Sequence, residues 1–158
     1  PDLKSKIFLL DYGKDVDKTK DLIRKIGIEN DIVWINKLPR KTLISILRYI
    51  DVSVGEFYQS ESIWGGTAIE ALALGKPFIN GFMFNKSTFE KDYGFPPPPF
   101  LFANSVREIE EHLVKLNSYK KYYEDVSYNS KKWFRDYHGI VLAEKWLEII
   151  KMNLDVDS

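Results

Sequence analysis

The sequence contains no cysteine among its 158 residues, and this absence excludes disulfides, thiolate zinc sites and thiol nucleophiles. No apolar run approaches the roughly 18 residues that a membrane-spanning helix requires. An excess of one charge is also missing, because 23 Lys plus Arg balance 23 Asp plus Glu. Without a basic excess we expect no nucleic-acid partner, and we expect a cytoplasmic protein with no membrane span.

Hydrophobic residues make up 44% of the chain, which is enough to form a core in a domain of this length. Short apolar runs alternate with stretches in which apolar residues recur at helical spacing. The runs suit strands buried on both faces of a parallel sheet, and they are residues 7–10, 32–35, 51–54, 78–80 and 100–103. The alternation predicts an α/β fold, a Rossmann-like doubly wound parallel sheet of about five strands with C-terminal helices.

We expect one domain over residues 1–152 and a frayed tail over 153–158. Four consecutive prolines, residues 96–99, are typical of a stiff connector or of an exposed proline-rich ligand, and their place inside the fold favours the connector. Ser105 and Glu108 have the spacing of a capping box, which predicts that a helix begins there.

The segment most informative about function begins with Gly65, Gly66 and Thr67, directly before an apolar helical stripe. Glycines let a backbone approach a ligand closely, and the N–H groups at a helix start attract anions. Glu70 follows one turn later, where its carboxylate can accept hydrogen bonds from ribose hydroxyls. These residues predict a site for a nucleotide diphosphate. A second interpretation stays equally open, because Thr67 and Glu70 also have capping-box spacing.

The remaining polar residues suggest less. Neither His-x-His nor His-Glu-x-x-His occurs, so we expect no metal site and no cofactor. We expect His112 to be a solvated surface residue, and His138 to cap or pack at a helix break. Segments 11–13 and 36–39 directly follow predicted strands, and ligands of doubly wound sheets bind beyond the carboxyl ends of strands.

The run from Gly65 to Ile79, Gly-Gly-Thr-Ala-Ile-Glu-Ala-Leu-Ala-Leu-Gly-Lys-Pro-Phe-Ile, resembles the signature of retaining glycosyltransferases of the GT-B fold, family 4. In that family the signature belongs to the C-terminal, nucleotide-sugar-binding domain. Four more segments of the chain resemble other parts of that domain in the same order, and they are residues 6–13, 32–38, 50–54 and 133–138. The resemblance implies half of a GT-B fold and transfer of a hexosyl unit from a UDP- or GDP-sugar to an acceptor hydroxyl with retention.

The resemblance also implies roles for individual residues. Glu70 would contact the ribose, while Gly65, Gly66 and Thr67 would hold the diphosphate. Ser62 occupies the position of the family's first donor-binding Glu, so the neighbouring Glu61 is the candidate for contacting the transferred sugar and for catalysis. The substrate-binding set is completed by Gly13 in the first glycine turn and by Asn36, Lys37 and Leu38 against the base.

Two features of the family are not found in these residues. An Arg and a Lys that neutralise the leaving diphosphate would lie before Pro1, and so would the N-terminal acceptor domain. We therefore expect a fragment whose partner is the missing N-terminal domain, and no sugar transfer by the fragment alone. Attachment of the intact enzyme to the inner membrane face stays open. The alternatives are a non-catalytic nucleotide-sugar-binding or protein-interaction module, and a nucleotide-sugar 2-epimerase-like enzyme.

Overall fold

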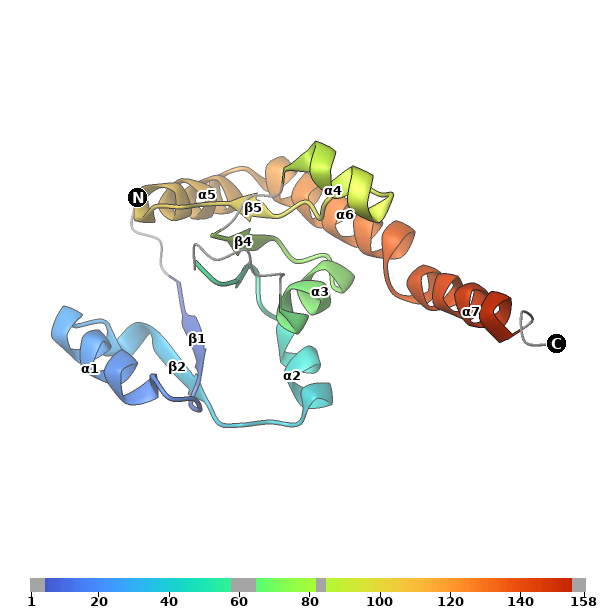
Figure 1. Cartoon of the computed structure of the whole chain (residues 1–158). Coiled ribbons are helices and arrows are strands. Elements are labelled where there is room, and N and C mark those ends of the chain that lie inside the picture. The colour runs from blue at the N-terminus through green and yellow to red at the C-terminus, as the bar shows by residue number, and fades with distance from the viewer. Residues whose placement is uncertain (1–4, 58–64, 82–84, 155–158) are drawn as a thin grey trace. The chain divides into compact units, whose positions relative to one another are not determined.

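The computed structural model describes residues 5–57, 65–81 and 85–154 (Figure 1). The chain divides into two compact units, Pro1–Ile46 and Leu47–Ser158. The elements in chain order are β1 (Ile7–Leu10), α1 (Val16–Ile26), a short 3-10 turn (Glu29–Asp31), β2 (Ile32–Ile35), α2 (Arg40–Leu47), β3 (Ser53–Val54), α3 (Gly66–Ala73), β4 (Phe78–Asn80), α4 (Lys86–Tyr93), β5 (Leu101–Phe102), α5 (Val106–Ser118), α6 (Lys120–Tyr137) and α7 (Ile140–Leu154).

The first unit is a βαβ arrangement. Strands β1 and β2 pair in parallel, with Ile7 opposite Ile32, and α1 connects them. Helix α1 buries Ile23 and ends at Gly27, whose left-handed backbone (φ 72°) lets its N–H donate to the Ile23 carbonyl at 3.0 Å. Both strands therefore end at the same edge of their sheet.

The second unit contains a three-stranded parallel sheet in the order β3-β4-β5. All three residues of the central strand β4 are buried. Helix α3 connects β3 to β4 and packs Ala68 and Ala71 against Phe78, beside the partly buried Phe100. Because these small residues seat α3 directly on the strand, the start of the helix has a fixed position relative to the sheet.

The chain leaves α3 through a Schellman motif. Gly75 donates its N–H to the Leu72 carbonyl at 3.0 Å, and Lys76 donates to the Ala71 carbonyl at 2.8 Å. The backbone of Gly75 is left-handed (φ 68°), and a Cβ there would lie 3.1 Å from the Ser127 carbonyl oxygen of α6. Glycine is therefore needed at this turn for its conformation and for the contact between α3 and α6.

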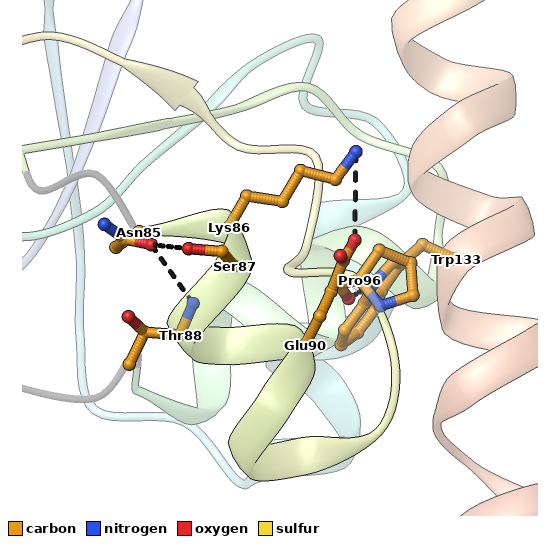
Figure 2. Close-up of polar contacts among 7 residues, drawn as sticks. All are labelled: Asn85, Lys86, Ser87, Thr88, Glu90, Pro96 and Trp133. Atoms are coloured by element: carbon orange, nitrogen blue, oxygen red, sulfur yellow. Dashed lines mark hydrogen bonds and ion pairs between the residues drawn. The ribbon is translucent and has the colours of Figure 1, made fainter.

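The four prolines are a packed connector, as predicted. Trp133 of α6 donates its indole N–H to the Pro96 carbonyl at 2.7 Å (Figure 2), and Pro98 is buried. Figure 2 also shows the start of α4, where the Asn85 side chain accepts the Thr88 N–H at 3.1 Å. The aromatic ring of Phe95, just before the run, stacks on that of Tyr137 at 5.5 Å between centroids.

The predicted capping box forms at the start of α5. The Ser105 hydroxyl accepts the Glu108 N–H at 3.3 Å, and the Glu108 carboxylate accepts the Asn104 N–H at 2.8 Å. The bond from Asn104, followed by that from the Ser105 hydroxyl, lowers the pKa of Glu108 below its usual value.

The expected fold class is confirmed as α/β with parallel strands. The five described strands form two sheets, of two and three strands, where one sheet was expected. Strands β3 and β5 are shorter than their apolar runs, since only two residues of each pair with a neighbouring strand. The single domain over 1–152 stays a prediction. Helix α7 continues to Leu154, and residues 155–158 lie outside the described part of the chain.

Candidate functional site

The strongest candidate site is the start of α3. The helix begins at Gly66, after Gly65 in an extended conformation (φ −72°, ψ 170°). The N–H groups of Gly66 and Thr67 are in the first turn, where no carbonyl of the same helix can accept them. Gly65, Gly66 and Thr67 are all exposed. This arrangement presents backbone donors and the positive end of a helix dipole to an anion.

The register of α3 decides between the two interpretations of Glu70. A capping box places Ser or Thr at the N-cap and Glu at the third helical residue. Here Gly65 is the N-cap, so Thr67 is the second helical residue and Ala68 is the third. Glu70 is the fifth residue, beyond the first turn, and its side chain is half-buried. The capping-box interpretation of Glu70 is therefore wrong.

Two further glycines shape the edge of the sheet from which the α3 connection departs. Gly55 follows β3 and donates its N–H to the Ile79 carbonyl at 2.8 Å, while Gly81 follows β4 and donates to the Glu56 carbonyl at 2.9 Å. A Cβ at Gly81 would lie 2.4 Å from the Cα of Phe57, and one at Gly55 would lie 2.6 Å from the Phe78 ring. Both positions require glycine because the two strand ends lie so close together.

Gly65 differs from these two glycines. Among the described residues, a Cβ added to Gly65 would meet nothing within 4 Å, and its φ of −72° is open to every residue type. The described part of the fold therefore does not require glycine at this position. Glycine there would also allow a ligand to approach the backbone closely.

The candidates in the first unit lie at one edge of the β1-β2 sheet. Gly13 has φ 120° and is exposed. It follows Asp11, whose N–H donates to the Ile35 carbonyl at 2.7 Å. The segment after β2 consists of the exposed Asn36 and Lys37 and the half-buried Leu38. Since parallel strands end at the same edge, Gly13 and Asn36 share it.

This edge also holds an ion pair that the motif analysis did not single out. The Lys20 ammonium lies 2.6 Å from the Asp11 carboxylate and 5.0 Å from the centroid of the Trp34 ring. Both charged groups are partly buried, so the pair fixes the turn between β1 and α1. The sequence does contain a signal for this ion pair, namely an acidic residue directly after a strand and a lysine on the inner face of the following helix.

The candidates thus divide into two groups. Gly65, Gly66, Thr67 and Glu70 belong to the unit Leu47–Ser158, whereas Gly13, Asn36, Lys37 and Leu38 belong to Pro1–Ile46. Within each unit, the structure brings the predicted residues to one strand edge or one helix end. Glu61 lies outside the described residues.

The two histidines are structural. The ring Nδ1 of His138 accepts the Gly139 N–H at 2.8 Å at the end of α6, which confirms the expected cap, and burial lowers its pKa. His112 is half-buried, with its Nε2 2.7 Å from the Phe102 carbonyl oxygen. The prediction of a solvated His112 was wrong, because its side of α5 faces the backbone of β5.

No group of three or more His, Asp or Glu side chains in residues 5–57, 65–81 and 85–154 is placed to share a metal ion. In the same residues, no helix is long and apolar enough to cross a membrane.

The sequence matches the family model described as glycosyl transferases group 1 over residues 2–133. Among solved structures, the chain is similar to the crystal structure of the pneumococcal O-GlcNAc transferase GtfA in complex with UDP and GlcNAc, with a TM-score of 0.63 and 16% identity. The match covers 94% of this chain and 29% of that one. At this identity it concerns the fold, and the expected half of a GT-B fold is confirmed. A search of curated proteins gave no match.

Proposed function

Because the chain belongs to the family of glycosyl transferases group 1, we propose that it is the donor-binding domain of a retaining, family 4 hexosyltransferase. The observation that carries the proposal is the start of α3, where the exposed Gly65 and Gly66 are the N-cap and the first residue of the helix and Glu70 lies outside the capping-box position. The donor is a nucleotide-diphosphate sugar. The GtfA complex with UDP and GlcNAc makes UDP-sugars the first donors to test.

The start of α3 binds the diphosphate and the ribose in this proposal. The N–H groups of Gly66 and Thr67, with the Thr67 hydroxyl, donate hydrogen bonds to phosphate oxygens. Glu70 is three residues further along the helix, about 4.5 Å along its axis, and its carboxylate accepts from the ribose hydroxyls. Since Ala68 and Ala71 seat the helix on β4, these groups are fixed before the ligand arrives.

The other candidate residues contact the remaining parts of the donor. Asn36, Lys37 and Leu38 contact the base, Gly13 lets the backbone approach the ligand, and Glu61 contacts the transferred sugar. These roles follow from the family resemblance of residues 6–13, 32–38 and 65–79.

The proposed reaction begins with departure of the nucleoside diphosphate from the anomeric carbon of the sugar. Negative charge develops on the leaving phosphate, and the donors at the start of α3 stabilise it electrostatically. The acceptor hydroxyl attacks the face that the leaving group has left, and its proton passes to a phosphate oxygen of the departing nucleoside diphosphate. The chain spans 29% of the length of GtfA, and we assign acceptor binding to a further domain.

Titration calorimetry of the chain with UDP, GDP, UDP-GlcNAc and GDP-mannose tests the proposal. We expect saturable binding of at least one diphosphate and weaker binding of the matching monophosphate, because the second phosphate adds contacts at the start of α3. The absence of any binding at millimolar concentration overturns the proposal.

Substitution of Gly65 by Asp separates binding from folding. An Asp at the N-cap caps α3 and complements its dipole, and none of the described residues lies within 4 Å of a Cβ at position 65. We therefore expect an unchanged or slightly higher free energy of unfolding in urea. The added carboxylate repels a bound diphosphate, so the nucleotide affinity measured by calorimetry should fall about tenfold.

The matched control is Gly65→Asn, which caps the helix without adding charge. Its nucleotide affinity should fall less than that of Gly65→Asp. Equal affinity in the wild type and in Gly65→Asp would place the diphosphate elsewhere.

A further inference from the structure

A pocket lies at the end of α3 that is opposite to the candidate donor site. It has a volume of about 370 Å³ and extends from Ala73, the last residue of α3, along the end of α6 to Ile140, the first residue of α7. Helix α3 has eight residues, so its two ends are about 12 Å apart. The pocket is therefore separate from the diphosphate site proposed above.

The pocket combines apolar walls with a cationic lining. Its apolar side chains include Tyr128 and Phe134 of α6 and Ile140 of α7. The charged side chains lining it are Lys131, Lys132 and Arg135, all from the same stretch of α6. The volume lies within the usual range for small-molecule sites, and the lining requires a ligand with both an apolar body and negative charge.

The ion pairs around the pocket do not neutralise all of its cations, so the net charge at the pocket is positive. Lys132 bonds one oxygen of Asp136, and Arg135 bonds the other at 2.8 Å. One carboxylate thus faces two cations, and with Lys131 the four groups carry a net charge of +2. The dipole of α6 accounts for a cation in its last turn, which holds Arg135, and Lys132 forms an i,i+4 ion pair with Asp136, so neither effect accounts for Lys131.

The wall of the pocket at the break between α6 and α7 is rigid. His138 accepts the Gly139 N–H at 2.8 Å through Nδ1, and its ring stacks on Phe134 at 5.3 Å between centroids. Gly139 has φ 61°, and a Cβ there would lie 3.0 Å from the Phe134 ring. These contacts hold Phe134, His138 and Gly139 before any ligand binds, so binding does not have to order these three residues.

We propose that this pocket binds an organic phosphate monoester with an alkyl or aryl body. Near neutral pH such a phosphate carries between one and two negative charges, which match the balance of +2, and its body fits against Tyr128, Phe134 and Ile140. The site lies at the end of α3 that is remote from the diphosphate, so the two ligands bind without overlap.

The test uses n-octyl phosphate as the probe, with n-octanol and inorganic phosphate as the two half-ligands. We expect octyl phosphate to bind more tightly than either, with amide shift changes at Gly139 in two-dimensional NMR. Lys131→Ala should lower the affinity about fivefold, which is the effect of one partly exposed charge. Lys115→Ala, which removes an exposed lysine from α5, is the matched control and should leave the affinity unchanged.

Two further arms complete the test. If the protein is recovered on phosphatidylcholine vesicles that contain phosphatidic acid, the source of the phosphate is a lipid. If octyl phosphate binds but the protein is not recovered on these vesicles, the source is a soluble ester. Saturating UDP should not displace octyl phosphate. The proposal is overturned if UDP displaces octyl phosphate, or if the protein binds neither octyl phosphate nor the vesicles. It is also overturned if Lys131→Ala and Lys115→Ala lose the same affinity for octyl phosphate. Failure of UDP to bind leaves it standing, because the donor site alone would then fail.

Discussion

Glu70→Gln is expected to lower the affinity for the nucleotide diphosphate about thirtyfold, a larger effect than its effect on the free energy of unfolding. The carboxylate accepts hydrogen bonds from two ribose hydroxyls, whereas the Gln amide offers one acceptor oxygen and a donor. Hydrogen bonds to a charged group contribute roughly 1.5–3 kcal/mol, and about 2 kcal/mol corresponds to this loss. Calorimetry gives the affinity, and urea unfolding gives the stability.

The ribose itself provides the control for this prediction. Wild-type protein should bind the 2′-deoxy nucleotide more weakly than the ribonucleotide, and Glu70→Gln should discriminate less between them, as a double-mutant cycle requires. Glu110→Gln, at an exposed position of α5, removes the same charge away from the site and should change neither quantity. A large loss of stability in Glu70→Gln with full discrimination retained would assign Glu70 to the fold instead.

The role of Glu70 depends on a helix register that the sequence alone leaves open. Gly65 and Thr67 are both acceptable N-caps, and moving the start by two residues decides whether Glu70 occupies the capping-box position. In the structure Gly65 is the extended N-cap, and the helix includes Gly66 and Thr67. Residue types alone do not choose between two N-caps so close in sequence, so the spacing left this choice open.

Features set by neighbouring residues were predicted correctly. The Ser105 and Glu108 capping box and the break after His138 depend on contacts within a few residues. The apolar runs predicted where the strands lie, although β3 and β5 are shorter than their runs. Features set by distant residues were not predicted. The close approach of Gly81 to Phe57, the bond between His112 and Phe102 and the division into two sheets join segments whose approach the local pattern does not specify.

Trp133→Ala is expected to have the largest effect on stability. Trp133 is only 5% exposed, and its ring contacts Phe95 at 6.0 Å and Tyr137 at 6.1 Å between centroids. Removing a buried aromatic side chain costs about 3–5 kcal/mol, and here it also frees the connector at Pro96. This is a large share of the roughly 5–15 kcal/mol that stabilises a typical domain. Urea unfolding followed by circular dichroism measures the loss.

Trp133→Phe separates the two contributions. It keeps most of the packing and removes the N–H bond to the Pro96 carbonyl (Figure 2), so a cost of about 1–2 kcal/mol is expected. Trp146→Ala removes the same side chain from an exposed position of α7 and should cost under about 0.5 kcal/mol. Equal losses in Trp133→Phe and Trp133→Ala would mean that the hydrogen bond, and not the packing, holds the proline connector against α6.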